Sequence, residues 1–375
     1  MKRTFTFLLI LCLSLNNIVL AAPFESYKGV VAGNLDNDEI VINYNGDNPV
    51  PIASTTKIMT YLVIKDLIAE GRGSLDDTLV FDEESLEVEG SKLDLVKGSK
   101  VRAETLLESI LISSANDSCL VLAKHFGESI PNFVRLMNSK AKELGLEKAI
   151  FYTPNGLADT EGNENTMTSE ELFTLSSHVI KKYPEILEIT SKKELIIKEY
   201  DIKLENTNNL LGDVKGVDGL KTGFTDNAGR CLIATGKKSE KSNRILSVIM
   251  GAESVEDRDQ KTIDIIDSLY NEYSSKILFN KNKTVGKKKI NDSKYVEIDL
   301  VPKEDVSIFI KDNEEYKSDI LIMKNLSYPI KKGDIIGKLI IEYGDTKKEF
   351  DLTTNNDISR LKAIQLWFKG FFNSI

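Results

Sequence analysis

The sequence predicts an α/β (α+β) fold in which helices flank an antiparallel sheet, followed by a small all-β domain and a C-terminal amphipathic helix. Within the first 275 residues, β-type runs occur near both ends, and helical patterns fill the stretch between them. Beyond residue 275, short β-type runs alternate with lysine-rich turns, and helical spacing of apolar residues returns at the end. We therefore expect the early and late strands of the larger domain to share one sheet.

The first elements are a hairpin and a buried helix. Two β-type runs, 27–32 and 39–44, flank a turn-rich stretch and predict an antiparallel hairpin. The run 58–68 that follows is apolar on nearly all sides, as in a helix buried in the middle of a domain. This helix is expected to stop at Gly71-Arg72-Gly73.

The middle of the chain is helical, and strands return after it. Helices are predicted over 103–113, 117–126, 130–144 and 169–182. The β-type runs 230–235 and 244–250 then predict central antiparallel strands, and the preceding strand carries Lys221-Thr222-Gly223. An amphipathic helix over 255–273 closes this domain, which we place at residues 23–275.

The remainder divides into a β domain and a tail. The small all-β domain is expected over residues 276–352, with β-type runs at 295–300, 306–310, 319–323 and 338–343. Residues 353–375 form a polar linker and an amphipathic helix that holds the only tryptophan of the chain. This helix, 357–375, is too short and too charged to span a bilayer but suits the interface of an anionic membrane. The alternative is a helix docked on the β domain.

The N-terminus predicts export. Lys2-Arg3 precede the apolar stretch 5–15, and Ala21-Ala22 offer a small-residue cleavage site, as in a signal peptide over residues 1–22. An uncleaved membrane anchor is the alternative, because two asparagines at 16–17 make the end of the segment irregular. Both interpretations predict an extracytoplasmic protein. With a cleaved signal peptide, the C-terminal helix would attach it peripherally to the cell membrane.

Composition restricts the function classes. The formal net charge of −9 makes nucleic acid an improbable partner. Neither histidine, His125 or His178, lies in a metal-binding motif, so no metal site and no cofactor is predicted. Beyond the leader only Cys119 and Cys231 remain, and we expect two buried free thiols, with a single bridge as the alternative.

Ser54-Thr55-Thr56-Lys57 is the most informative motif of the chain. A serine and a lysine three positions apart share one face of a helix, which predicts a serine nucleophile with a lysine base. The S-x-x-K pattern alone is weak, since it recurs at 139–142 and 359–362. Its order with Ser114-Ala115-Asn116 and the single K-T-G at Lys221-Thr222-Gly223 makes it specific. A helix N-cap is the alternative role for Ser54.

The residue chemistry fits covalent catalysis. Lys57 acts as a base only if its pKa falls from about 10.4 toward neutrality, and burial and a second cation, Lys221, both favour that. Ser114 would pass a proton to the departing amine, while Asn116 would hold a substrate amide. Lys221 and Thr222 offer a cation and a hydroxyl to a substrate carboxylate, and Gly223 lets the substrate backbone pair with the strand.

The segments around these motifs, 51–60, 111–117 and 216–225, resemble the low-molecular-mass penicillin-binding proteins of the D-alanyl-D-alanine carboxypeptidase family. The resemblance implies a transpeptidase/β-lactamase-like domain, a small β domain and an amphipathic anchor. It also implies site residues: Ser54 as acyl-ester nucleophile, Lys57 as proton acceptor, Ser114 as second catalytic serine, Lys221 in substrate binding, and an oxyanion hole from the backbone N–H groups of Ser54 and Phe224. Ala115 and Phe224 depart from the glycine and histidine common in the family.

The expected activity is therefore hydrolysis of the terminal D-Ala-D-Ala bond of peptidoglycan pentapeptides, with β-lactams as covalent inhibitors. A class A β-lactamase is the nearest alternative, and Glu143-Leu144-Gly145-Leu146-Glu147 lies near the region of the glutamate that it needs. A non-catalytic penicillin-binding or wall-binding protein is the alternative from a different class. It would have lost a catalytic residue, and here none is lost.

Overall fold

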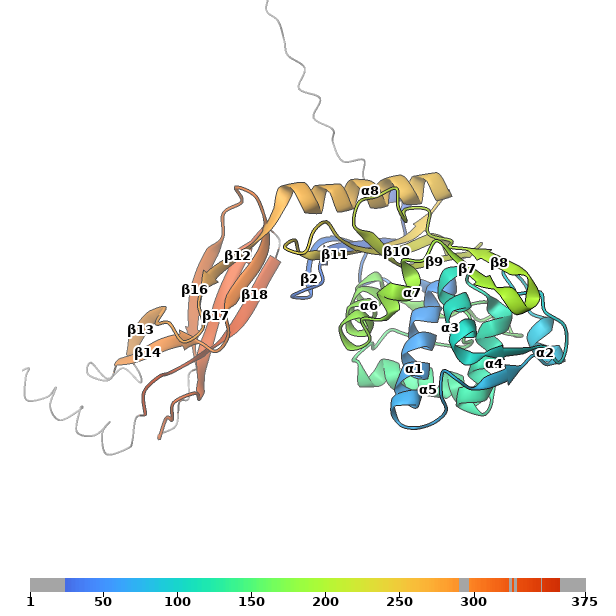
Figure 1. Ribbon diagram of the computed structural model, residues 1–375. Helices are drawn as coiled ribbons and strands as arrows, with labels where there is room; N and C mark the ends of the chain where they lie inside the picture. Colours follow the sequence, from blue (N-terminus) through green and yellow to red (C-terminus); the bar gives the residue numbers. More distant parts are fainter. Residues whose placement is uncertain (1–23, 290–296, 324–325, 327–328, 345, 358–375) are drawn as a thin grey trace, which may run out of the picture.

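The computed structural model describes residues 24–357, apart from 290–296, 324–325, 327–328 and 345. It contains an α/β part and, beyond the end of the long helix α8 (Val255–Glu272), a set of β strands (Figure 1). The predicted leader and the predicted C-terminal amphipathic helix lie outside the described residues. Within the described part, no helix combines the length and hydrophobicity needed to cross a membrane.

A five-stranded antiparallel sheet forms the centre of the α/β part. Its strand order is β2-β1-β11-β10-β9. The strands are β1 (Gly29–Asn34), β2 (Glu39–Tyr44), β9 (Val217–Thr225), β10 (Gly229–Lys237) and β11 (Arg244–Ala252). Val31 of the first hairpin pairs with Val248 near the end of the domain, which confirms that the early and late strands share one sheet.

Helices cover both faces of this sheet. Helix α8 packs on one face, against β10 and β11, and the remaining helices gather on the other (Figure 1). These are α1 (Lys57–Ala69), α3 (Ala103–Ile112), α4 (Asn116–Gly127), α5 (Ile130–Glu143), α6 (Ser169–Lys182) and the shorter α2 (Glu83–Leu86) and α7 (Ile186–Thr190). Helix α1 is buried on nearly all sides, as its apolar sequence predicts, and therefore occupies the middle of the helical layer.

Several short elements were not predicted. Two-residue to four-residue strands form small ladders, because such short runs carry too little periodicity to be recognised. They are β3 (Val50–Pro51) with β6 (Thr166–Met167), β4 (Thr78–Val80) with β5 (Lys100–Arg102), and β7 (Glu194–Ile197) with β8 (Ile202–Glu205), and the 3₁₀ turns are η1 (Phe24–Ser26), η2 (Ala53–Thr56) and η3 (Lys198–Tyr200).

The C-terminal β part has its own core. Its strands are β12 (Tyr273–Phe279), β13 (Gly286–Lys289), β14 (Glu297–Pro302), β15 (Val306–Lys311), β16 (Lys317–Ile322), β17 (Ile335–Tyr343) and β18 (Thr346–Thr353). Four of them match the predicted β-type runs, whereas β12, β13 and β18 were missed. Strand β12 starts directly after α8, so the helix and the strand share one continuous segment.

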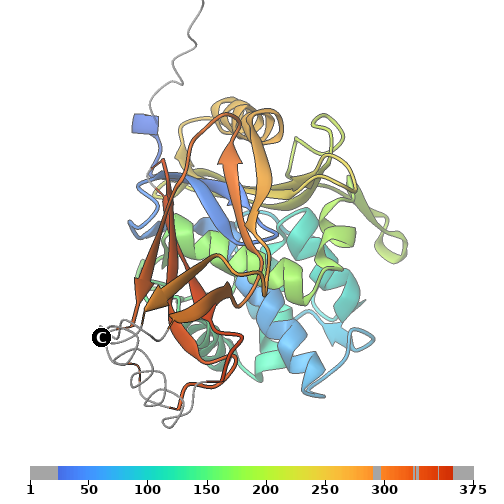
Figure 2. The same ribbon diagram turned by 90° about the vertical axis from the view of Figure 1, so that its left-hand side faces the viewer.

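The two parts touch through specific side chains. In Figure 2, seen from the left of Figure 1, the orange and red strands lie in front of the α/β part. Phe309 of β15 packs in one apolar cluster with Tyr27 and Val30, and its ring stacks on Tyr273. The side chain of Glu39 in β2 is only 1 % exposed. It forms an ion pair with Lys348 of β18 at 2.6 Å and accepts a hydrogen bond from the Tyr343 hydroxyl.

Candidate active site

Ser54 lies on a tight 3₁₀ turn rather than inside a helix. This turn, η2, leads directly into α1, whose first residue is Lys57. Residues three apart eclipse one another in 3₁₀ geometry. The Lys57 Nζ accordingly donates a hydrogen bond to the Ser54 Oγ at 2.7 Å. The alternative role of Ser54 as a helix N-cap is wrong, because Thr56 occupies the N-cap position of α1.

Lys57 is completely buried among hydrogen-bond acceptors. Its Nζ also donates to the Asn116 Oδ1 and to the Asn155 backbone carbonyl, each at 2.8 Å. Among the described residues, no carboxylate lies within ion-pairing distance of this amine. Burial lowers the pKa of Lys57 to about 8, because a charged ammonium loses its water there. The neutral form of Lys57, which can act as a base, is therefore far more populated near neutral pH than it is for an exposed lysine.

Ser114 and Asn116 occupy the junction between α3 and α4, as the sequence predicts. Ser114 has a left-handed backbone, with φ of 65°, a conformation that costs energy in a non-glycine residue and that clusters at functional sites. Asn116 is the first residue of α4, and its Nδ2 donates to the Glu89 carbonyl at 2.7 Å. Since the amide nitrogen carries two hydrogens, one stays available for a ligand.

Strand β9 places Lys221-Thr222-Gly223 against the nucleophile turn. A Cβ built on Gly223 would lie 3.2 Å from the Ser54 backbone nitrogen, so only glycine lets the strand approach this closely without displacing its neighbours. The Thr222 Oγ1 donates to the Thr207 Oγ1 at 2.6 Å. The Lys221 Nζ donates to the Thr222 carbonyl at 3.0 Å and is itself buried.

Both active-site lysines have lowered pKa values. Burial lowers the pKa of Lys221 well below its usual value, and the nearby charges of Lys57 and Arg258 lower it further. For Lys57, burial is the cause of the lowered pKa. Because repulsion between two ammonium groups is mutual, the proximity of Lys57 and Lys221 favours the neutral form of one of them.

Most of the predicted site residues line one cavity of about 460 Å³. The predicted residues that line it are Ser54, Ser114, Asn116, Thr222, Gly223 and Phe224, and the others are Gly90, Ser91, Leu157, Thr207, Asn209, Arg230, Val255 and Arg258. Lys57 and Lys221 lie behind this wall, buried beneath the residues that they contact. Sequence reasoning missed Arg230, Arg258 and Asn155, because nothing in their local sequence distinguishes them from structural residues.

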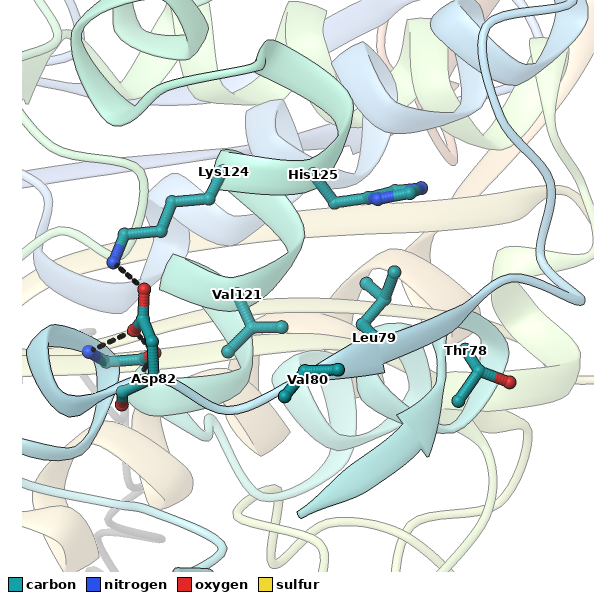
Figure 3. Close-up of a pocket in the computed structure, with 8 residues that line it drawn as sticks. Thr78, Leu79, Val80, Asp82, Val121, Lys124 and His125 are labelled. Atoms are coloured by element: carbon teal, nitrogen blue, oxygen red, sulfur yellow. Dashed lines mark hydrogen bonds and ion pairs between the residues drawn. The ribbon is translucent and has the colours of Figure 1, made fainter. Parts of the chain in front are cut away.

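A second hollow has a different character. It measures about 330 Å³ and lies between β4 and α4 (Figure 3). Its polar side chains already have partners: Lys124 contacts Asp82 at 2.5 Å, and the His125 Nε2 contacts the Asp77 carboxylate at 2.9 Å. None of the predicted site residues lines it, and His125 is a surface residue.

The glutamates considered for a β-lactamase lie elsewhere. Glu143 ends α5 and pairs with Lys140 at 2.6 Å, and Glu147 is exposed. Neither residue lines the cavity that holds Ser54. Cys119 and Cys231 are both buried free thiols, which excludes the bridge between them in this structure.

Comparison with known families matches residues 25–254 to the family described as D-alanyl-D-alanine carboxypeptidase. The chain belongs to this family. Residues 273–360 match the C-terminal domain of penicillin-binding protein 5. Both matches agree with the division into an α/β part that holds the site and a β part.

Individual relatives cover most of the chain. The D-alanyl-D-alanine carboxypeptidase DacF of Bacillus subtilis is 31 % identical over 340 residues, which are 89 % of this chain and 86 % of the relative. Penicillin-binding protein 5 of Haemophilus influenzae superposes with a TM-score of 0.76 at 26 % identity, covering 89 % of this chain and 98 % of that one. Penicillin-binding protein D2 of Listeria monocytogenes, solved with ampicillin bound, is 32 % identical with a TM-score of 0.59, covering 64 % of this chain and 96 % of that one.

Proposed function

We propose that this protein is a serine-type D-alanyl-D-alanine carboxypeptidase, which removes the terminal D-alanine from peptidoglycan pentapeptides through an acyl-enzyme on Ser54. The contact between the Ser54 Oγ and a buried Lys57 of lowered pKa carries this proposal. A serine hydroxyl becomes an effective nucleophile only when a base near neutrality accepts its proton. Family membership agrees with the same activity.

Acylation begins with neutral Lys57. It takes the Ser54 proton while the Oγ bonds to the carbonyl carbon of the penultimate D-alanine. The backbone N–H groups of Ser54 and Phe224 stabilise the resulting oxyanion, and Gly223 keeps these two segments close. When the C–N bond breaks, Ser114 relays a proton to the departing amine, and D-alanine leaves.

Deacylation reuses the same residues. Lys57, neutral again, accepts a proton from a water molecule that attacks the ester carbon. The C–Oγ bond breaks, the proton returns to Ser54, and the shortened peptide leaves. Asn116 supports both steps, because its Oδ1 fixes the Lys57 amine while one Nδ2 hydrogen remains for the substrate carbonyl.

Substrate binding uses the far wall of the cavity. The Thr222 hydroxyl would exchange its hydrogen bond to the Thr207 Oγ1 for one to the C-terminal carboxylate, while the Lys221 amine stays on the Thr222 carbonyl. Gly223 lets the peptide backbone run along β9. β-Lactams present a similar carboxylate and carbonyl, so we expect them to acylate Ser54 and to be released slowly.

The β-lactamase alternative is less well supported. Fast hydrolysis of the penicilloyl ester on the serine needs a glutamate that activates the attacking water. Neither Glu143 nor Glu147 lines the cavity that holds Ser54, so neither is placed to activate this water. The alternative of a non-catalytic binding protein has no support either. The base Lys57 contacts the nucleophile Ser54, and the second serine, Ser114, lines the same cavity as Ser54.

We further propose an extracytoplasmic location. A signal peptide over residues 1–22 would export the chain, and helix 357–375 would attach it to the membrane surface. The corresponding units would be a catalytic domain at 23–275, a β domain at 276–352 and the linker with its anchor at 353–375.

The decisive experiment compares residues 23–375 with the Ser54→Ala and Ser139→Ala variants. Ser139 begins the other described S-x-x-K sequence but lies exposed on α5, so it is a matched control. Stable labelling by a fluorescent penicillin, with D-alanine release from diacetyl-Lys-D-Ala-D-Ala, should vanish only in Ser54→Ala. Rapid penicillin turnover without peptide cleavage would instead establish a β-lactamase.

Membrane attachment needs a separate test. Residues 23–375 and 23–356 should be compared for co-sedimentation with vesicles that contain anionic or only zwitterionic lipids. We expect the longer chain alone to bind, and to prefer anionic vesicles. Equal behaviour of both chains would favour the docked helix.

A further inference from the structure

Asn165, directly before strand β6, is completely buried next to the nucleophile turn. Its Oδ1 accepts hydrogen bonds from the backbone N–H groups of Tyr152 and Thr153, at 2.7 and 3.0 Å. Its Nδ2 donates to the Thr153 carbonyl at 2.8 Å and to the Thr56 Oγ1 at 3.0 Å. Both amide hydrogens and both oxygen lone pairs are therefore used, which is the full hydrogen-bonding capacity of this side chain.

These bonds connect two segments of the chain, loop 152–157 and the nucleophile turn η2. The Asn165 backbone carbonyl also accepts from the Ile52 N–H at 3.0 Å, so Asn165 binds the chain on both sides of the turn. The loop packs tightly on the turn, because a Cβ on Gly156 would overlap the Ala53 carbonyl. Asn165 is therefore the residue whose hydrogen bonds fix the loop to the turn.

The loop held in this way supplies hydrogen-bond acceptors to helix α1. The Asn155 carbonyl accepts from the Lys57 Nζ at 2.8 Å, and the Pro154 carbonyl accepts from the Thr60 Oγ1 at 2.5 Å. A carbonyl can hold an ammonium group in one place only if its own peptide is fixed. The peptides directly before these two carbonyls are the ones that Asn165 binds, so the position of the Asn155 carbonyl depends on Asn165.

We propose that Asn165 is a positioning residue for the acylation step. By connecting its loop to the nucleophile turn, it keeps the Asn155 carbonyl on the Lys57 amine and keeps that amine in contact with the serine hydroxyl. This inference rests on the proposed carboxypeptidase function, and it adds a residue that does not line the cavity of Ser54.

The titratable groups that face Lys57 do not connect it to Asn165. They are Cys119 of α4 and Lys221 of β9. Within the described part of the chain, Asn165 forms no hydrogen bond with either of them. A substitution of Asn165 should therefore act on Lys57 only through the loop and the turn.

Asn138 of α5 is a matched control, because it binds the chain at the start of the same loop. Its Nδ2 donates to the Phe151 carbonyl at 2.8 Å, and its Oδ1 accepts from the Phe151 N–H at 3.0 Å. It has no hydrogen bond to the nucleophile turn in the part of the chain that the structure describes. Replacing either asparagine by alanine leaves backbone groups of this segment without their partners, so both changes should lower stability.

The test compares the Asn165→Ala, Thr56→Val and Asn138→Ala variants of residues 23–375. Stopped-flow labelling by a fluorescent penicillin between pH 5.5 and 9.5 gives the plateau rate of acylation and the pH midpoint of its rise. Calorimetry gives Tm. Thr56→Val removes only the acceptor on the nucleophile turn, so it tests the proposal even if Asn165→Ala does not fold.

We expect Asn165→Ala to lower the plateau rate roughly 10- to 100-fold, because the serine and its base lose their alignment. The midpoint should also move roughly one pH unit lower, because the charged amine of Lys57 loses one hydrogen bond and its neutral form is favoured. Thr56→Val should change both quantities in the same direction, but less. Asn138→Ala should lower Tm and leave the midpoint and the plateau rate unchanged.

Three results would overturn the assignment. A lower Tm in Asn165→Ala, with an unchanged plateau rate and midpoint, would show that Asn165 only stabilises the fold. Unchanged acylation in Thr56→Val would show that the bond to the turn is not needed. An equal shift of the midpoint in Asn138→Ala would show that any loosening of the loop has this effect. If the unaltered enzyme neither releases D-alanine nor reacts with penicillin, the carboxypeptidase function itself fails, and that outcome is separate from all three.

Discussion

The Lys57 Nζ and the Ser54 Oγ lie 2.7 Å apart, and this contact links the fold of the nucleophile turn to the pH range in which the enzyme works. Burial places the pKa of Lys57 at about 8, so the protonated form dominates below that pH and cannot accept the serine proton. We expect the rate of penicillin acylation to rise about tenfold per pH unit below 8 and to level above it. Stopped-flow labelling between pH 5.5 and 9.5 measures this profile.

The matched variant for this prediction is Lys57→Arg. It keeps a cation next to Ser54 but cannot lose its proton at any pH tested. Acylation should fall by at least about a thousandfold, with no recovery at high pH. A flat profile in the unaltered enzyme, or a rising limb retained in Lys57→Arg, would remove Lys57 as the base.

A substitution at Asn116 should shift the pH profile of acylation while leaving Ser54 and Lys57 themselves unchanged. Its Oδ1 accepts from the Lys57 Nζ at 2.8 Å, so Asn116→Asp would place a carboxylate beside the amine. An opposite charge this close raises the pKa of a lysine by roughly 1 to 3 units. The rising limb of acylation should therefore move to higher pH, with the rate at pH 7 reduced in proportion.

Asn116→Ala is the control for the shift. It removes the contact without adding charge, so it should lower the rate while leaving the limb near pH 8 or below it. If Asn116→Asp and Asn116→Ala give the same midpoint, the contact does not set the protonation of Lys57.

The sequence was most informative where chemistry depends on residue type and order. Ser54, Ser114, Asn116 and Thr222 line one cavity although they come from three separate parts of the chain, and their motifs predicted that gathering. The shared sheet was also predictable, because strong β-type runs at both ends of a helical region have few other ways to bury their apolar faces.

The sequence could not predict which residues distant in the chain contact one another in the fold. Arg230 is an ordinary strand residue until the ladder sets it against Phe224. Asn155 contributes to the site only its backbone carbonyl, an atom that every residue carries. The burial of Lys221 could not be predicted for the same reason, since burial follows from packing rather than from residue order.

Gly223 tests how closely β9 must approach the nucleophile turn. A Cβ at this position would lie 3.2 Å from the Ile52 carbonyl and from the Ser54 and Thr55 nitrogens, all of which are backbone atoms that cannot rotate away. Gly223→Ala should therefore displace the strand by a few tenths of an ångström and lower acylation roughly 10- to 100-fold. Penicillin labelling measures the effect, and thermal unfolding should change little.

Gly286→Ala provides the comparison, because a Cβ there meets only the Ile320 and Leu300 side chains at 3.4 Å or more. It should retain normal acylation. A Gly223→Ala enzyme with normal acylation would show that the two segments can separate without loss of the oxyanion site.

Glu39 tests the junction between the α/β part and the β part. Its carboxylate is 1 % exposed and lies 2.6 Å from the Lys348 Nζ, which is itself 23 % exposed, while the Tyr343 hydroxyl donates to its other oxygen. Glu39→Ala leaves a partly buried ammonium and a buried hydroxyl without their acceptor, at a cost of about 2 kcal/mol. Because β2 is at the opposite edge of the sheet from β9, D-alanine release at 25 °C should stay unchanged. Calorimetry should show the β part unfolding earlier, as a transition separate from that of the α/β part.

Glu342→Ala is the matched control, since this exposed carboxylate of β17 pairs with Lys347 at 3.7 Å and should contribute almost nothing. A single unshifted transition in Glu39→Ala would mean that the apolar contacts around Phe309 hold the two parts together without this ion pair.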